Sequence, residues 1–166
     1  MDGENQNKEI KEDIVTESEV KSKVIEDEIL QGETNKEIKL YKVVENLGLE
    51  IVHQSSDYYE INLPSADVNR PGLQLAGYLE DFPYKRLQII GSVEYNYLTG
   101  LDSKLQYERF RGILSYNIPA VIFTYNADIN QDIVDLADYY DKTLLRSPEK
   151  TTKLISDISD ELEYQL

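Results

Sequence analysis

Two continuous apolar runs constrain the fold of this chain more than any other sequence feature. One is Arg86–Ile90, which is closed by Gly91, and the other is Ala120–Thr124, which follows Pro119. A short apolar run without polar alternation is typical of a strand that is buried on both faces of a parallel sheet. Parallel neighbours need a crossover connection, and Ser103–Tyr116 has the apolar spacing of a helix between these two strands.

The remaining periodicity extends this alternation of strands and helices. Helices are predicted at 38–47, ended by Gly48, and then at Gly72–Tyr78, at Ile129–Tyr140 and from Ser147-Pro148 onward. Further strands are predicted at Leu49–His53, Tyr59–Leu63 and Thr143–Leu145, with a turn at Asn69–Gly72. The sequence therefore predicts an α/β domain with a small, mainly parallel sheet and crossover helices.

The composition changes near residue 38. Residues 1–37 contain twelve acidic residues and five lysines, a net charge of 5 − 12 = −7, and no aromatic residue. Low hydrophobicity with high charge favours disorder, because such a segment buries too little surface to offset its ordering entropy. We therefore predict an acidic, mostly disordered tail over 1–37 and a folded domain over 38–166. Alternatively, a helix at Ser18–Leu30 docks on a partner, since its apolar residues have helical spacing.

Charge and residue usage exclude several functional classes. The formal net charge is −15, so we expect neither nucleic-acid nor membrane-surface binding. The chain has no cysteine and a single histidine, His53, which excludes disulfides, thiolate metal sites and multi-histidine zinc sites. No metal site is predicted. The N-terminus lacks the basic and apolar regions of a secretory signal, and no apolar stretch is long enough to span a membrane, so we expect a soluble, cytoplasmic protein.

Few residue patterns suggest chemistry. Gly72–Gly77 has the glycine spacing of a phosphate-binding loop, but Tyr78 and Leu79 follow where that loop requires Lys and Ser or Thr. ATP binding by this device is therefore not expected. Paired carboxylates can bind a hard cation or divide acid and base roles, but in a chain this acidic we expect the existing pairs to be solvated surface. These pairs are Asp57 with Glu60, Glu80 with Asp81, and Asp138 with Asp141.

The stretch Asp67–Glu94 has the sequence DVNRPGLQLAGYLEDFPYKRLQIIGSVE. It resembles the N-terminal, non-catalytic domain of the HPr kinase/phosphorylase family. The family pattern combines an Asn-Arg-Pro-Gly turn, Leu-x-Leu-Ala-Gly-Tyr, Phe-Pro, Arg-x-Gln, an aliphatic pair and a glycine followed by glutamate. The resemblance extends from about Tyr41 to Leu166. The residues that carry the pattern are Asn69, Arg70, Pro71, Gly72, Leu73, Leu75, Ala76, Gly77, Tyr78, Phe82, Pro83, Arg86, Gln88, Ile89, Ile90, Gly91 and Glu94.

The resemblance implies a role inside a larger enzyme of carbon-catabolite regulation. In the family, this domain precedes a kinase domain that uses ATP and Mg²⁺ to phosphorylate a serine of the phosphocarrier HPr, and also dephosphorylates it. Family members form hexamers. None of the family's catalytic residues has a position here, so we expect no catalytic residues, no cofactor and no activity of the chain alone. We expect it to be a fragment of such an enzyme, or a stand-alone regulatory copy, with the kinase domain as its partner and HPr reached through that domain.

Two functions remain open at this stage. The resemblance implies a regulatory or assembly domain, and it also implies a fold similar to the N-terminal domain of the Mur ligases. The alternative is a stand-alone protein-interaction domain or sensor of an anionic metabolite, held by Arg70, Arg86 or a helix N-terminus. Candidate binding residues are Asn69, Arg70, Gly72 and Arg86. Arg70 can also satisfy internal acceptors, and we expect a positive φ at Gly72, directly after Pro71.

Overall fold

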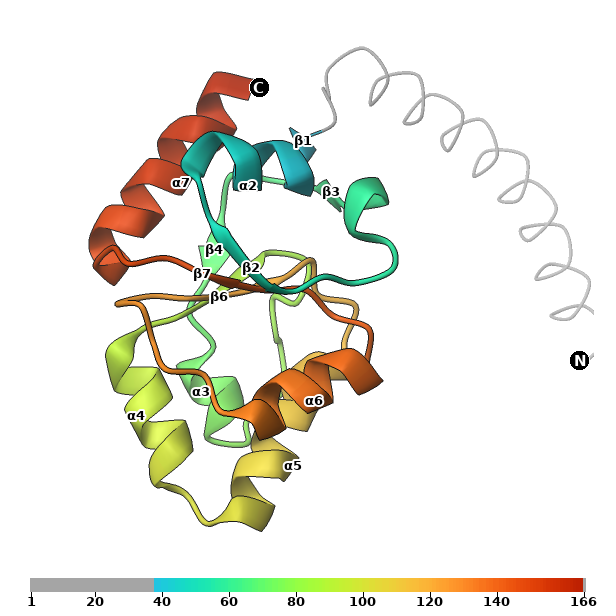
Figure 1. The fold of residues 1–166 in the computed structure, drawn as a ribbon, viewed down its shortest axis with the longest axis vertical. Helices are drawn as coiled ribbons and strands as arrows, with labels where there is room; N and C mark the ends of the chain where they lie inside the picture. The colour runs from blue at the N-terminus through green and yellow to red at the C-terminus, as the bar shows by residue number, and fades with distance from the viewer. Residues whose placement is uncertain (1–37, 166) are drawn as a thin grey trace, which may run out of the picture. The chain divides into compact units, whose positions relative to one another are not determined.

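The computed structural model describes residues 38–165, which form a sheet with helices on both faces (Figure 1). The sheet has five strands in the order β2-β7-β6-β5-β4. Neighbours from β4 to β7 are parallel, and β2 pairs with β7 in the antiparallel direction. The predicted α/β fold with a mainly parallel sheet is therefore confirmed. The strands are β2 (Glu50–His53), β4 (Val68–Asn69), β5 (Leu87–Ile90), β6 (Val121–Phe123) and β7 (Leu144–Arg146).

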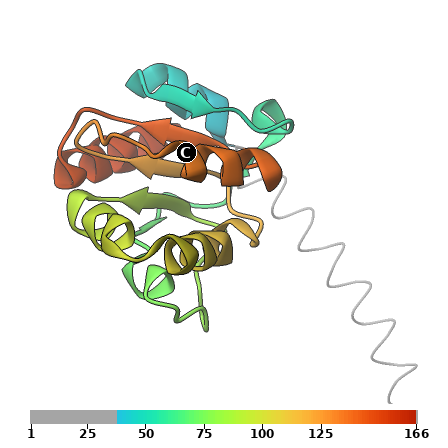
Figure 2. The same ribbon diagram turned by 60° about the horizontal axis from the view of Figure 1, so that its bottom comes forward.

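Different helices cover the two faces of the sheet (Figures 1 and 2). The crossovers between parallel strands pack their apolar residues into one cluster on one face. They are α3 (Gly72–Leu75), α4 (Ser92–Gly100), α5 (Ser103–Leu114) and α6 (Gln131–Tyr139). The second face carries a separate cluster with a short antiparallel strand pair. Its elements are β1 (Ile38–Lys39), α2 (Leu40–Leu47), the 3₁₀ helix η1 (Tyr58–Glu60), β3 (Asn62–Leu63) and α7 (Thr151–Gln165).

The apolar runs of the sequence form the centre of the sheet. Ile89 of β5 pairs with Ile122 of β6, which pairs with Leu145 of β7, and all three side chains lie on the face of α2 and α7. Ile90 and its neighbour Phe123 lie on the opposite face. Each such fully buried side chain contributes about 1.5–3 kcal/mol. Burial on both faces therefore explains why these strands lack polar alternation.

Local signals determine several helix ends. Gly48 has φ +63° and its N–H donates to the carbonyls of Glu45 and Val44, so the predicted C-terminal cap of α2 is confirmed. The Asp102 carboxylate caps α5 by accepting a hydrogen bond from the Leu105 N–H at 3.0 Å.

Several local predictions differ from the structure. The strand predicted at Tyr59–Leu63 is η1 followed by a short β3, because the buried Tyr58 packs edge-on against Tyr59 and turns the chain. The helix predicted from residue 38 begins at Leu40, since Ile38 and Lys39 pair with β3. Part of the predicted turn Asn69–Gly72 is strand β4, and α4 was not assigned at all.

A further difference concerns the start of the last helix. It begins at Thr151 rather than at Pro148, because the Ser147 hydroxyl accepts a hydrogen bond from the Glu149 N–H in a preceding turn. The tail predicted over 1–37 and the helix predicted at Ser18–Leu30 lie outside the described residues. Within residues 38–165, no helix combines the length and apolar character needed to cross a bilayer.

Candidate functional site

Parallel strands end at a common edge, and that edge collects polar residues here. Arg70 follows β4, Gly91 follows β5 and Thr124 follows β6. Thr151 is the first residue of α7, which begins after β7 at the same edge. In open α/β sheets, ligands bind outside the carboxyl ends of the strands, so this is the first place to look for a site.

Arg70 and Glu94 form a two-pronged ion pair at this edge. Arg70 Nε donates to Glu94 Oε1 at 2.7 Å, and Arg70 Nη2 donates to Glu94 Oε2 at 3.0 Å. The Glu94 side chain is only 11% exposed, whereas Arg70 is 44% exposed. Glu94 lies in the first turn of α4, where the helix dipole favours a negative charge. The guanidinium therefore has a carboxylate partner within the domain.

Gly91 brings these groups into contact with α7. A Cβ at Gly91 would lie 2.8 Å from Arg70 Nη2, from Glu94 Oε2 and from Thr151 Oγ1. The Thr151 hydroxyl is in turn 2.8 Å from the Thr124 hydroxyl, which donates to the Ile90 carbonyl at 3.3 Å. We refer to Arg70, Gly91, Glu94, Thr124 and Thr151 as the Gly91 cluster. It connects the ends of three strands with the start of the last helix.

Asn69 belongs to a neighbouring amide network. Its Nδ2 donates to Gln88 Oε1 at 2.7 Å and lies 3.4 Å from Gln74 Oε1. Gln88 is fully buried, and its Nε2 donates to the carbonyls of Pro83 and Arg86. The Asn69 and Gln88 amide nitrogens thus donate to acceptors within the domain, as expected for buried polar groups.

The other two predicted binding residues are placed differently. Gly72 opens α3 without a positive φ, so that expectation was wrong, and a Cβ there would meet only Glu94 Cγ at 4.0 Å. Arg86 lies at the amino end of β5, with its Nη2 3.9 Å from the Asp67 carboxylate. Asn69, Arg70 and Gly72 therefore lie at the carboxyl end of β4. Arg86 comes two residues before Gln88, the cross-strand partner of Asn69, and its guanidinium faces Asp67 instead of the Arg70–Glu94 pair.

Arg70→Ala should lower the free energy of unfolding by about 1–3 kcal/mol, because the nearly buried Glu94 carboxylate loses its partner. Adding Glu94→Gln should recover part of this loss, since no unpaired charge remains. Urea unfolding of the single and double variants measures both effects. Arg86→Ala is the matched control and should change stability by less than about 0.5 kcal/mol. Equal losses for Arg70→Ala and Arg86→Ala would contradict a stabilising ion pair.

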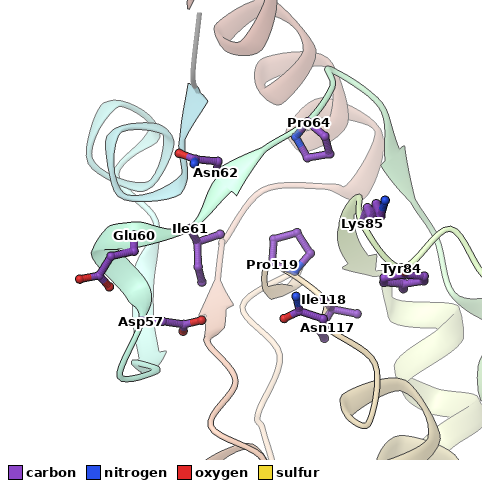
Figure 3. A pocket seen from close by; sticks show the side chains of 10 residues that line it. All are labelled: Asp57, Glu60, Ile61, Asn62, Pro64, Tyr84, Lys85, Asn117, Ile118 and Pro119. Carbon is purple, nitrogen blue, oxygen red and sulfur yellow. The ribbon is translucent and has the colours of Figure 1, made fainter. Parts of the chain in front are cut away.

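A pocket lies at the opposite, amino-terminal edge of the sheet (Figure 3). It has a volume of about 460 Å³. The segment from η1 to β3 forms one wall, and the loops that precede β5 and β6 form the other. Its lining combines apolar residues such as Ile61 and Pro119 with polar residues such as Asp57 and Asn117. Only the pair Asp57 and Glu60 was noted in the sequence, because the remaining walls come from segments far apart in the chain.

Asp138 and Asp141 are surface carboxylates that contact the loop after β2. Asp138 Oδ1 is 3.2 Å from His53 Nε2, and His53 Nδ1 is 2.8 Å from the Lys142 carbonyl. The Ser56 hydroxyl and N–H both donate to Asp141 and hold the pKa of that carboxyl below its usual range. Among residues 38–165, no group of three or more His, Cys, Asp or Glu residues is arranged to hold a metal ion.

The fold and its motif define a class of small α/β domain, with a mainly parallel sheet and a glycine-centred polar cluster at the carboxyl edge. The family model described as HPr Serine kinase N terminus matches residues 38–162, and the chain belongs to that family.

Relatives with the name HPr kinase/phosphorylase match over most of this chain. The protein of Alkaliphilus metalliredigens is 38% identical over 131 residues, which are 79% of this chain and 42% of the relative. Those of Thermoanaerobacter sp. and Peptoclostridium acidaminophilum are 36% and 35% identical, covering 78% and 80% of this chain and 42% of each relative. The chain thus spans about two fifths of the length of these relatives.

Solved structures with a similar fold include a regulatory region of a pyrophosphatase. It contains the CBS and DRTGG domains of the regulatory region of Clostridium perfringens pyrophosphatase, complexed with its activator diadenosine tetraphosphate. The match has a TM-score of 0.54 and 14% sequence identity, and it covers 75% of this chain and 47% of that chain. At this identity the likeness concerns the fold alone.

Proposed function

We propose that this chain is the regulatory and assembly domain of an HPr kinase/phosphorylase. The parent enzyme would phosphorylate and dephosphorylate a serine of HPr, with ATP and Mg²⁺ bound in its kinase domain. It would act in the cytoplasm, in carbon-catabolite regulation linked to the phosphotransferase system, and as an oligomer such as the hexamer expected for the family. The observation that carries this proposal is the family match over residues 38–162, together with a relative of whose length the match covers only 42%.

The internal bonding of the motif supports a scaffolding role. Arg70 is paired with Glu94, and Asn69 is bonded within an amide network. Arg70 already has a carboxylate partner inside the domain, and no observation favours the metabolite-sensor alternative. The Gly91 cluster instead fixes the start of α7, the last helix of the family match. We propose that α7 connects this domain to the kinase domain and holds the two in a fixed relative orientation.

A domain exchange tests this role. Residues 38–166 replace the matching region of the Alkaliphilus metalliredigens enzyme, and HPr phosphorylation and oligomer mass are measured. We expect the chimera to reproduce the oligomeric state and regulation of the intact relative. The relative's kinase region alone is the reference, and the chimera carrying Gly91→Ala is the control for a damaged domain. A chimera that behaves like the kinase region alone would refute the assembly and regulatory role.

The isolated chain should not phosphorylate HPr. The loop Gly72–Gly77 is followed by Tyr78 and Leu79, so it lacks the lysine that contacts phosphates and the hydroxyl that binds Mg²⁺. Incubation of the 166-residue chain with HPr, ATP and Mg²⁺, followed by mass spectrometry, should detect no phosphoserine above a chain-free control. Phosphoserine at a rate proportional to chain concentration would contradict this prediction.

A further inference from the structure

A second pocket lies between α5 and α6, away from both edges of the sheet described above. It has a volume of about 320 Å³. Ile133 and Leu136 of α6 line it and are almost completely buried, so its base is apolar. Two tyrosines also line it, Tyr107 from α5 and Tyr139 from α6, which are 45% and 79% exposed. Aromatic side chains this accessible are available for contact with another molecule.

Two carboxylates complete the lining of this pocket. Asp132, Asp135 and Tyr139 are spaced three and four residues apart on α6, which places them on one side of the helix. Asp135 accepts a hydrogen bond from the neutral Gln131 side chain at 2.9 Å. Within the part of the chain that the structure describes, neither aspartate forms an ion pair with Lys or Arg.

The composition of the pocket suits one kind of occupant. A guanidinium can stack on a tyrosine face and form bidentate hydrogen bonds with carboxylates, and its methylene stem can cover apolar surface. The Tyr107 ring already contacts one guanidinium, since Arg111 Cζ lies 5.8 Å from its centroid. The net charge of −15 further favours a cationic partner.

We propose that the pocket between α5 and α6 binds an arginine side chain presented by a partner protein. The stem lies on Ile133 and Leu136, and the guanidinium lies between the tyrosine rings and bonds to Asp132 and Asp135. Lysine fits less well, because its ammonium is more strongly hydrated and cannot stack as a plane. This binding site is independent of the proposed role in an HPr kinase/phosphorylase.

A peptide titration of the whole 166-residue chain tests the site. The probes are acetyl-Gly-Arg-Gly-amide, the lysine peptide and the citrulline peptide, which keeps the shape of arginine without its charge. Backbone amide shifts are followed by NMR. We expect saturable shifts at Tyr107, Asp132, Asp135 and Tyr139, with the arginine peptide binding at least about tenfold more tightly than the citrulline peptide and more tightly than the lysine peptide.

Matched variants separate the pocket from general acidity. The pair Asp132→Asn and Asp135→Asn should weaken arginine-peptide binding about tenfold, and Tyr139→Ala should weaken it about threefold. The controls on α7 are the pair Asp160→Asn and Glu163→Gln, which removes the same charge, and Tyr164→Ala, whose side chain is 88% exposed. The controls should change binding by less than twofold.

Three results would overturn the proposal. Equal weakening by the α7 charge variants would show only long-range attraction. Equal affinity for arginine and lysine peptides would exclude arginine recognition, and shifts centred elsewhere would exclude this pocket. Thermal unfolding of each variant verifies that it is folded, and the aspartate and tyrosine variants test the pocket independently of each other.

Discussion

Gly77→Ala is expected to lower the free energy of unfolding by about 2–4 kcal/mol. Gly77 has φ +101°, a conformation that side chains with a Cβ rarely adopt. The new Cβ would also lie 2.3 Å from Arg109 Nη1 and 2.9 Å from Arg109 Cζ. Because both distances are shorter than van der Waals contact, the Arg109 guanidinium would have to move. Its Nη1 is buried without a hydrogen-bond partner among the described residues. Urea unfolding should show a lower midpoint with an unchanged slope.

Gly72→Ala is the matched control in the same segment. Gly72 has no positive φ, and its nearest non-local atom would be 4.0 Å from the new Cβ. We expect a change of less than about 1 kcal/mol, since the backbone there suits alanine. Adding Arg109→Ala to Gly77→Ala should restore only the part of the loss due to the clash. Equal stabilities for Gly72→Ala and Gly77→Ala would contradict this account.

Gly91→Ala should cost about 1–3 kcal/mol, by overpacking the centre of the Gly91 cluster. The methyl group would displace the Arg70 and Glu94 side chains, which are 2.8 Å away, and also the shorter Thr151. Gly100→Ala is the control, because no atom lies within 4 Å of its Cβ position. Thermal unfolding compares the two.

A double variant shows whether the ion pair carries the effect of Gly91→Ala. The variant that combines Gly91→Ala with Arg70→Ala should lose less stability than the sum of the two single losses, because both substitutions disrupt the same contacts. Strict additivity would mean that the methyl group acts elsewhere.

The sequence predicted those elements whose burial is uniform. Leu87–Ile90 and Val121–Phe123 are buried on both faces, so their composition alone identifies them as strands. Tyr59–Leu63 was misread, because alternation of apolar residues also occurs where one tyrosine is buried and the next packs against it. The spacing of apolar residues does not predict secondary structure reliably where burial changes from one residue to the next.

The predicted site depends on contacts that spacing cannot reveal. Arg70 and Glu94 both belong to the quoted motif, but their ion pair requires that β4 and β5 be parallel and in register. A positive φ was expected at Gly72, directly after Pro71, but in this motif Gly77, which follows α3, has it instead. The pocket in Figure 3 and the pocket between α5 and α6 each join segments that are distant in sequence, so neither could be predicted from the sequence.

The antiparallel pairing of β2 with β7 has a consequence for how the chain folds. The first strand of the sheet lies beside the last one, and Arg146 of β7 bonds to Glu50 of β2 at 2.6 and 2.9 Å. During synthesis β2 emerges early, but its neighbour is missing until residue 146 has left the ribosome. Pairings between such distant residues close large loops and slow folding. We therefore expect nascent chains that end before β7 to expose one edge of β6 and the whole of β2, and to depend on chaperones until the last strand is inserted.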